Sequence, residues 1–337
     1  MSHASRLTVR AASLTGMTAL CRSYGVDAGV ILRQAGLPSS IESQPDRRVA
    51  VTSVNLALEL AALTCGCPDF GLRLSELRGF SNLGPISLLA RDEPTVGDAI
   101  RAIAKYLPLH NDALVVTQEI YDDIAVLRCD IVVAGTKTQA NDIAVAMQYR
   151  ILVNFAGPLC RAEQICLSRP QPADISKYRE VFGQSLTFDA EFDGIVVKTS
   201  VLDQPNPIAE AGLRPYASQF LRMSDPGHGA PAAERVRRLL ETLLSNRRCT
   251  ASFIATQLGV SRRTLTRALE AEGTTFLALL DQTRTEIARR HLEGGDRPLS
   301  EIADLLGFSS QSAFSTWFLR KFDMPPRQWR RQHGVRP

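Results

Sequence analysis

Arginine side chains follow directly after a short apolar pattern in the last third of the chain. Residues 254–261 read Ile-Ala-Thr-Gln-Leu-Gly-Val-Ser, and Arg262, Arg263 and Arg267 come next. A guanidinium group donates two parallel hydrogen bonds, so arginine suits both phosphate oxygens and the edge of guanine. The chemistry of this segment therefore indicates a polyanion as its partner.

The same apolar pattern occurs a second time, 48 residues further along the chain. Residues 302–309 read Ile-Ala-Asp-Leu-Leu-Gly-Phe-Ser, which repeats the frame Ile-Ala-x-x-Leu-Gly-apolar-Ser. In each copy the apolar residues share one face of a short helix, the glycine can end that helix with a positive φ, and the serine can cap the next helix. This pattern is typical of a helix-turn-helix, and its recurrence indicates a duplicated unit.

The helices after the two turns are predicted over residues 262–272 and 310–322. Leucine and alanine form the inner face of the first helix, and phenylalanine and tryptophan form that of the second. Arginine pairs with guanine, glutamine with adenine, and hydroxyl groups hold phosphates. A merely solvated surface would explain neither the repeat nor the arginine content. The candidate DNA-binding residues are Arg262, Arg263, Thr266, Arg267, Gln311, Ser312, Thr316, Arg320 and Lys321.

A long helix is predicted between the two copies, over residues 275–293, with Gly294-Gly295 ending it. Such a rod would hold the two outer helices at a fixed distance. Successive major grooves on one face of double-stranded DNA lie roughly 34 Å apart. One chain could therefore reach two grooves of a promoter.

The distribution of charge supports this interpretation. Residues 232–337 contain 18 Lys and Arg against 11 Asp and Glu, whereas residues 1–231 contain 21 against 24. All but one of the 18 C-terminal cations are arginine. The asymmetry predicts that the C-terminal part binds a polyanion and the N-terminal part does not.

The C-terminal sequence closely resembles the AraC/XylS family of transcription regulators over about residues 234–332. The most specific part is Ile302-Ala303-x-x-Leu306-Gly307-Phe308-x-Ser310-x-Ser312-Ala313-Phe314-Ser315-x-x-Phe318-x-Arg320, followed by Pro326-x-x-Trp329-Arg330. The resemblance implies base contacts from Arg263, Thr266 and Arg267, base contacts from Gln311, Ser312 and Thr316, and phosphate contacts from Arg320 and Lys321.

The chain departs from the family pattern at two positions. Asp323 stands where glycine is usual, but aspartate tolerates the left-handed conformation, so we expect the turn to survive. Thr316 stands where many members carry arginine. The second outer helix is consequently neutral where the first is cationic, and we expect the first to dominate the reading of DNA sequence.

The remainder of the chain predicts an α+β domain with a small, mostly antiparallel sheet. We expect domains over residues 1–223 and 233–337, the second of them all-α, joined by a linker at 224–232 that contains two prolines and two glycines. The elements expected in the first domain are helices over 53–63, 96–107, 140–155 and 173–182 and strands over 113–120, 124–133, 164–167 and 194–199, with a turn at 121–123.

Several short motifs in this first domain resemble the effector-binding domain of the branch of the family that includes ornithine- and virulence-related regulators. The resemblance implies a domain that senses a small molecule and dimerises, and it leaves the identity of the effector open. The motifs are Arg48-Val-x-Val51, Asp69-Phe-Gly-Leu72, Pro94-Thr-Val-Gly-Asp-Ala99, Tyr106 and Phe182-Gly183.

Other residues that could do chemistry are scattered. His110 precedes the predicted hairpin, and we interpret it as a helix-end histidine with satisfied hydrogen bonds, with a sensing or haem-binding role as the alternative. Cys65 and Cys67 are the one close thiol pair, and no histidine lies nearby. We expect no cofactor and no metal, since no nucleophile with a base and no set of metal ligands occurs at a suitable spacing.

Together these features favour an effector-responsive activator, with RNA polymerase as a further partner. The start of the chain lacks a secretion signal and no apolar run of about 18 residues occurs, so we expect a cytoplasmic protein with reduced thiols. Two alternatives remain: an N-terminal enzyme fused to a DNA anchor, and an architectural DNA-binding protein without an effector. Activation and repression cannot be distinguished, because the outcome depends on where the site lies in the promoter.

Overall fold

The computed structural model describes residues 7–133, 135–157, 160–207, 209, 230–244, 249–258, 260–293 and 297–333. The chain divides into two compact units, Met1–Pro226 and Gly227–Pro337. Most of the expected linker lies outside the described residues, and so do the expected helix-ending glycines Gly259, Gly294 and Gly295.

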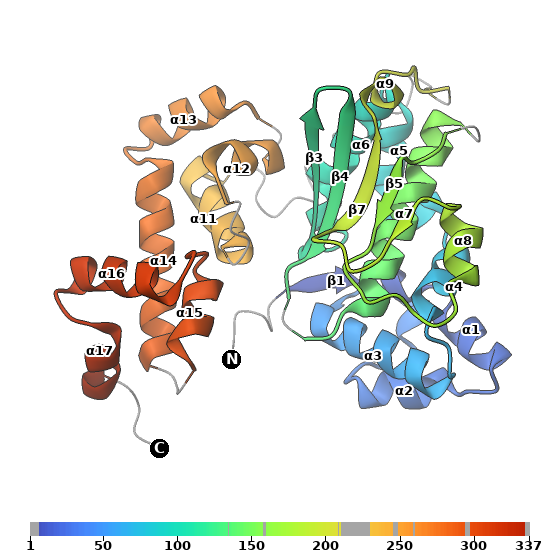
Figure 1. The fold of residues 1–337 in the computed structure, drawn as a ribbon, viewed down its shortest axis with the longest axis horizontal. Helices are drawn as coiled ribbons and strands as arrows, with labels where there is room; N and C mark the ends of the chain where they lie inside the picture. The colour runs from blue at the N-terminus through green and yellow to red at the C-terminus, as the bar shows by residue number, and fades with distance from the viewer. Residues whose placement is uncertain are drawn as a thin grey trace. The chain divides into compact units, whose positions relative to one another are not determined.

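A five-stranded sheet organises the first unit (Figure 1). Its strand order is β3-β4-β7-β5-β6, and every neighbouring pair is antiparallel except β5 with β6. The predicted hairpin forms, and Asp122 turns the chain with a φ of 49°. The strands are β3 Leu114–Tyr121, β4 Ile124–Ile131, β5 Gln164–Cys166, β6 Leu186–Thr187 and β7 Asp193–Lys198.

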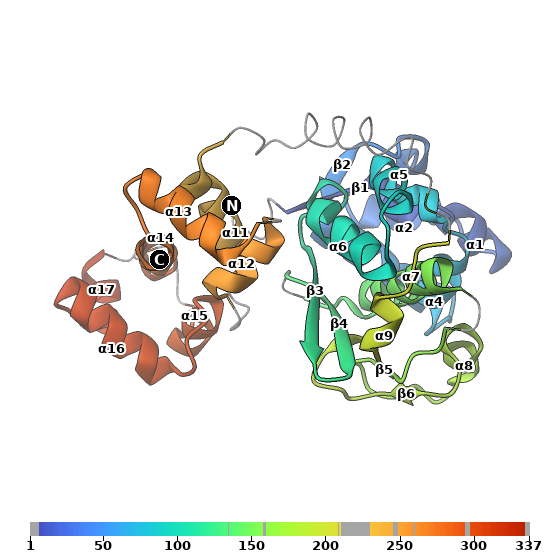
Figure 2. The same ribbon diagram turned by 90° about the horizontal axis from the view of Figure 1, so that it is seen from above.

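Helices α6 (Val96–Tyr106) and α7 (Thr138–Ala156) lie against one face of this sheet, as Figure 2 shows. Thr95 caps α6, because its Oγ1 atom accepts a hydrogen bond from the Asp98 N–H at 3.1 Å. The remaining helices around the sheet are α5 Pro85–Arg91, α8 Ser176–Phe182 and α9 Thr199–Leu202.

The residues before the sheet form a smaller helical layer that opens with a two-stranded sheet. Strand β1 (Thr8–Arg10) pairs antiparallel with β2 (Arg48–Ala50), and neither strand was predicted. The α-helices of this layer are α1 Met17–Ser23, α2 Ala28–Gln34, α3 Val51–Thr64 and α4 Phe70–Glu76. Short 3₁₀ helices occupy Ala11–Leu14, Ile41–Ser43, Phe80–Leu83 and Leu107–Leu109.

The first unit has two apolar cores, and helix α7 contributes to both. Val145 and Leu152 belong to the core under the five-stranded sheet, whereas Ala140 and Ile143 belong to the core of the helical layer. Close contact between α4 and α7 requires Gly71, since a Cβ atom there would lie 2.3 Å from the Gln139 carbonyl oxygen. This contact explains the glycine of the Asp69-Phe-Gly-Leu72 motif.

All the regular secondary structure described in the second unit is helical. The α+β first domain and the all-α second domain are therefore as the sequence predicts. The helices are α11 Ala232–Leu243, α12 Ala251–Gln257, α13 Arg262–Ala271, α14 Phe276–Glu293, α15 Leu299–Leu305, α16 Gln311–Phe322 and α17 Pro326–His333. Across all the residues that the structure describes, no helix combines the length and the apolar character needed to span a membrane.

Candidate nucleic-acid interface

Helix α13 is the outer helix of the first helix-turn-helix unit. The Ser261 Oγ atom caps it by accepting a hydrogen bond from the Thr264 N–H at 3.0 Å. Leu265 and Leu269 are buried against the unit, which leaves the opposite face of the helix in solvent. The four candidate residues on that face are all exposed: Arg262, Arg263, Thr266 and Arg267.

Helix α16 repeats this arrangement in the second unit, with one correction: its cap is Ser310 and not Ser309, the serine of the repeated frame, so α16 begins one residue later than the repeat predicts. The Ser310 Oγ atom accepts a hydrogen bond from the Ala313 N–H at 3.1 Å, and Phe314 and Phe318 are completely buried. At the other end of the helix Asp323 takes a φ of 51°, which confirms that aspartate can replace the usual glycine. The five candidate residues of this helix are also exposed: Gln311, Ser312, Thr316, Arg320 and Lys321.

Lys321 has a partner within the protein, which the sequence did not predict. Its Nζ atom forms an ion pair with the Asp281 carboxylate on α14, and the Trp317 indole N–H donates to the same carboxylate at 2.9 Å. Burial acts to raise the pKa of Asp281, but these two hydrogen bonds outweigh it and hold the pKa below its usual value. A phosphate contact from Lys321 thus requires this pair to open or to be shared.

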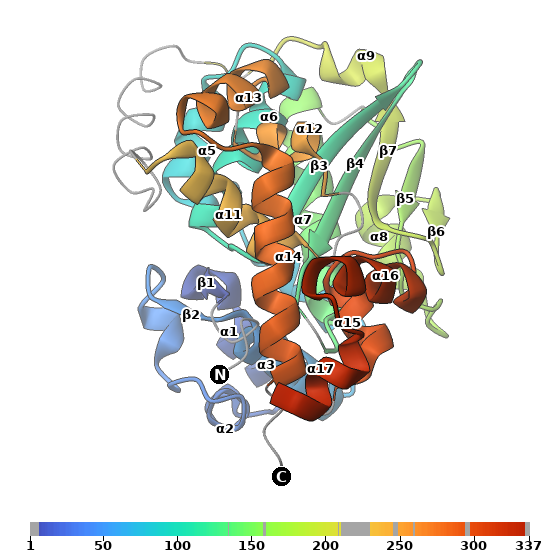
Figure 3. The same cartoon turned by 90° about the vertical axis from the view of Figure 1, so that its left-hand side faces the viewer.

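Helix α14 is the rod between the two outer helices. Its 18 residues correspond to a length of about 27 Å, with α13 near its beginning and α16 beside its middle (Figure 3). On its inner face Leu279, Ala288 and Leu292 are buried. The rod therefore presents two capped helices with outward polar faces at separate positions along one axis.

Arg284 attaches this rod to the second turn, and sequence reasoning missed its role. Its Nε atom donates to the Leu306 carbonyl oxygen at 3.0 Å, and its guanidinium group lies 4.5 Å from the centre of the Phe308 ring. Gly307, between these residues, has a φ of 69°. The sequence did contain one indication of this role, since Arg284 is a charged residue on a helix face that is otherwise apolar.

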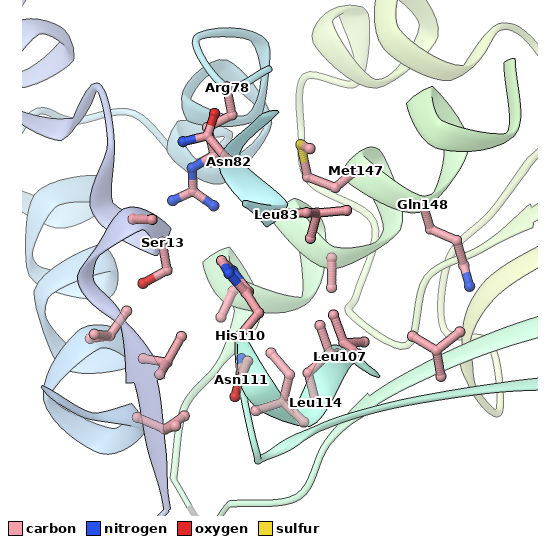
Figure 4. Close-up of a pocket in the computed structure, with 18 of the residues that line it drawn as sticks. Ser13, Arg78, Asn82, Leu83, Leu107, His110, Asn111, Leu114, Met147 and Gln148 are labelled. Atoms are coloured by element: carbon pink, nitrogen blue, oxygen red, sulfur yellow. The ribbon is translucent and has the colours of Figure 1, made fainter. Parts of the chain in front are cut away.

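A second candidate site lies in the first unit, where residues of both cores line a cavity of about 130 Å³. Residues of β1, α3, α6, α7 and β3 line it, together with the segment around His110 (Figure 4). The sequence indicated an effector-binding domain but did not indicate which residues would face the effector. Among the lining residues, the sequence had singled out His110 and, within the Arg48-Val-x-Val51 motif, Val51.

The interpretation of His110 as a satisfied helix-end histidine is wrong. Its Nδ1 atom is buried and has no hydrogen-bond partner in the described part of the protein. Burial, together with the charges of Arg10, Arg78 and Arg48, lowers the pKa of His110 to about 3, so the ring is neutral at physiological pH. Part of the ring faces the cavity instead of other side chains.

Arg48, from the first of the N-terminal motifs, holds this segment in place. Its Nη1 atom donates to the Leu109 carbonyl oxygen at 2.7 Å, and its Nη2 atom pairs with the Asp112 carboxylate at 2.9 Å. The Arg10 N–H donates to the His110 carbonyl oxygen at 2.8 Å, which joins the segment to β1. The arginine of the Arg48-Val-x-Val51 motif thus fixes the position of the segment that carries His110 beside the cavity.

Within the Cys65 and Cys67 pair, the Cys67 thiol lies beside polar side chains of the protein itself. Cys67 Sγ lies 3.1 Å from the Asp69 carboxylate and 3.4 Å from the Tyr24 hydroxyl. Burial raises the pKa of both the Cys65 and the Cys67 thiols. Within the described ranges, no group of three or more His, Cys, Asp or Glu side chains is placed to hold a metal ion.

Two family models match the chain: residues 25–206 match the arabinose-binding domain of AraC transcription regulator, N-terminal, and residues 254–332 match a helix-turn-helix domain. The HTH-type transcriptional regulator VirS of Mycobacterium tuberculosis is 33% identical over 331 residues, which cover 97% of each chain. The chain belongs to the AraC family of transcription regulators.

Two further relatives are respectively less and more identical in sequence to this chain than VirS is. The ornithine utilization regulator of Pseudomonas aeruginosa is 26% identical over 317 residues, which cover 92% of this chain and 93% of that protein. The transcriptional activator NphR of Rhodococcus is 37% identical over 107 residues, which cover 32% of each chain. As an AraC-family member the chain therefore combines an effector-binding domain with a helix-turn-helix region.

Proposed function

We propose that this AraC-family regulator is an effector-responsive activator whose helices α13 and α16 enter two successive major grooves of a promoter. The observation that carries the proposal is the position of two capped helices along α14, each with a buried apolar face and an exposed polar face. Activators occur among the relatives, which supports activation over repression.

In this proposal the individual side chains have distinct roles. Arg263, Thr266 and Arg267 contact bases from α13, with Arg262 beside them at the start of the helix. Gln311, Ser312 and Thr316 contact bases from α16, while Arg320 and Lys321 hold phosphates. The exposure of all nine side chains supports these roles.

The first unit senses the effector in this proposal and does not transform it. The cavity between its two cores supports a binding role. An effector changes transcription only if it binds one state of the protein better than another. We infer further that the chain works in the cytoplasm as a homodimer formed through the first unit, with RNA polymerase as its partner, on the support of the family to which it belongs.

Replacing Arg267 with alanine tests the central role of α13. The change should weaken binding to the cognate promoter by about 1–3 kcal/mol, since one bidentate contact to a base is lost. The measurement is an equilibrium DNA titration of the full chain at constant salt, because affinity for DNA depends strongly on salt.

Arg290→Ala is the matched control. It removes one exposed positive charge from α14 without altering either outer helix. The control should retain most of the promoter affinity. Equal affinities of wild-type protein and Arg267→Ala for the promoter would exclude base reading by Arg267.

A further inference from the structure

The cavity of the first unit contains a buried cation without a counterpart. Arg78 is 7% exposed and lines the cavity, and its Nε and Nη2 atoms have no hydrogen-bond partner among the described residues. Burial lowers the pKa of Arg78 to about 10, so the guanidinium group is still charged at neutral pH. An unpaired buried charge is costly, which points to a partner that this chain does not supply.

The two unpaired nitrogens lie on the same edge of the guanidinium group. Nε–H and one N–H of Nη2 point in parallel and together match the two oxygens of a carboxylate. Glu42 is the acidic residue that acts electrostatically on Arg78, but it does not line the cavity and its carboxylate accepts the Thr18 N–H at 2.7 Å. The fork of Arg78 is therefore available to an anion that enters the cavity.

The rest of the lining limits the chemistry of that anion. Among the described lining residues Arg78 and His110 are the ionisable ones, and no carboxylate is present. A ligand with an ammonium group would thus find no ionic partner. Most of the wall is apolar and would hold a hydrocarbon body: Val9, Val51, Val54, Leu58, Leu83, Ile100, Ile103, Leu107, Leu114, Val116, Ile131, Met147 and Ile151.

The volume of the cavity limits the size of the hydrocarbon part of the ligand. A cavity of about 130 Å³ is close to the roughly 150 Å³ that holds one benzene molecule in an apolar protein interior. Figure 4 shows Arg78 and Asn82 together at one side of the cavity and Gln148 at another. Both polar atoms of the Gln148 side chain also lack partners among the described residues, so the cavity has unmet hydrogen bonds at more than one place.

We propose that this cavity binds a small, mainly apolar monocarboxylate of about six to eight carbon atoms in all, whose carboxylate pairs with the Nε and Nη2 atoms of Arg78. This assignment rests on the proposed function, because it gives the chemical class of the effector. The neutral ring of His110 and the amide of Gln148 also line the cavity.

Isothermal titration calorimetry of the full chain without DNA tests the proposal. The probes are hexanoate and benzoate, compared with hexan-1-ol and hexylamine, which have similar bodies and no negative charge. The carboxylates should bind at least tenfold more tightly than the alcohol, and the amine should not bind. Equal affinity for hexanoate and hexan-1-ol, or no binding of either carboxylate, would overturn the assignment without requiring any variant.

Two variants locate the site. Arg78→Met should reduce the affinity for hexanoate to that for hexan-1-ol, whereas Arg22→Met, which removes an exposed arginine of α1, should leave it unchanged. Ala144→Leu adds atoms inside the cavity from α7 and should abolish binding. Retained binding in both Arg78→Met and Ala144→Leu would place the carboxylate elsewhere and contradict the proposal.

The test separates this inference from the proposed function. If a carboxylate binds through Arg78 but leaves promoter affinity and transcription unchanged, the ligand assignment stands and effector control fails. If no carboxylate binds while the protein still activates a promoter, the ligand assignment alone fails.

Discussion

At the scale of single residues, the second turn requires glycine at position 307 for two reasons. Its φ of 69° costs an L-residue roughly 1–2 kcal/mol, and a Cβ atom there would lie 2.3 Å from the Leu244 carbonyl oxygen. Gly273 has a similar φ of 71° but no atom within 4 Å of such a Cβ. The two positions therefore separate backbone strain from steric overlap.

We predict that Gly307→Ala lowers the free energy of unfolding by more than about 2 kcal/mol, because strain and overlap combine. Gly273→Ala should cost about 1–2 kcal/mol from strain alone. Urea denaturation of both full-length variants gives the comparison. Equal losses at the two positions would show that the contact with Leu244 is relieved without cost.

The lowered pKa of His110 leads us to predict that the stability of the folded protein depends on pH. Its pKa is near 3 in the folded protein and about 6.5 in an unfolded chain. Below about pH 6.5 the unfolded chain takes up a proton that the folded protein does not, so the free energy of unfolding falls as the pH falls from 6.5 towards 3. The loss approaches about 1.4 kcal/mol for each pH unit within this window.

His110→Gln should flatten this dependence, since glutamine does not titrate. Denaturation of both proteins between about pH 5 and pH 7 measures the slope, and denaturation at about pH 8 gives the difference that does not depend on titration. Identical slopes for the variant and the wild-type protein would mean that another group controls acid stability.

At the scale of elements, the N-terminal cap of α16 gives a matched pair of serines. Ser310 accepts the Ala313 N–H, whereas its neighbour Ser309 is exposed and precedes the cap. Ser310→Ala should cost about 1 kcal/mol of stability and weaken promoter binding, because the start of α16 loosens. Ser309→Ala should leave both unchanged, and thermal denaturation together with DNA titration distinguishes the two. A Ser310→Ala protein as stable as Ser309→Ala would contradict the role of the cap.

The elements of the second unit could be predicted closely from the sequence. The outer helices were expected at 262–272 and 310–322 and occur at Arg262–Ala271 and Gln311–Phe322. The reason is local, since the repeated turn, the capping serine and the period of apolar residues all lie within a few residues of each helix.

The first unit could be predicted less completely. Strands β1 and β2 have three residues each and pair across about 40 residues of chain, so no local period marks them. Arg78 shows the same limit for the site. From sequence alone an arginine is expected at the protein surface. Arg78 is a buried cation with two unpaired nitrogens only because of how the folded chain packs around it.

At the scale of the whole molecule, the two helix-turn-helix units differ in charge although their frames match. Helix α13 presents three exposed arginines, and the corresponding face of α16 presents Gln311, Ser312 and Thr316. We predict that the half-site under α13 discriminates bases more strongly, because arginine makes a bidentate contact with guanine.

Single-base substitutions across the promoter test this ranking. Those under α13 should each cost about 1–3 kcal/mol of affinity, and those under α16 should cost less. Arg267→Ala should relax discrimination at one position under α13, and Gln311→Ala provides the corresponding change under α16. Stronger discrimination under α16 would reverse the ranking and leave the general function intact.

The central claim is that one chain places two helices in successive major grooves. Hydroxyl-radical footprinting of the full chain on its promoter tests it most directly. For each bound chain we predict two protected segments on one face of the DNA, separated by about 10 base pairs, so that a bound homodimer protects two such pairs. In each pair the segment under α13 should be lost in an Arg263→Ala, Arg267→Ala double variant and the segment under α16 retained. Protection of a single groove, or loss of both segments together with unchanged folding, would contradict the claim.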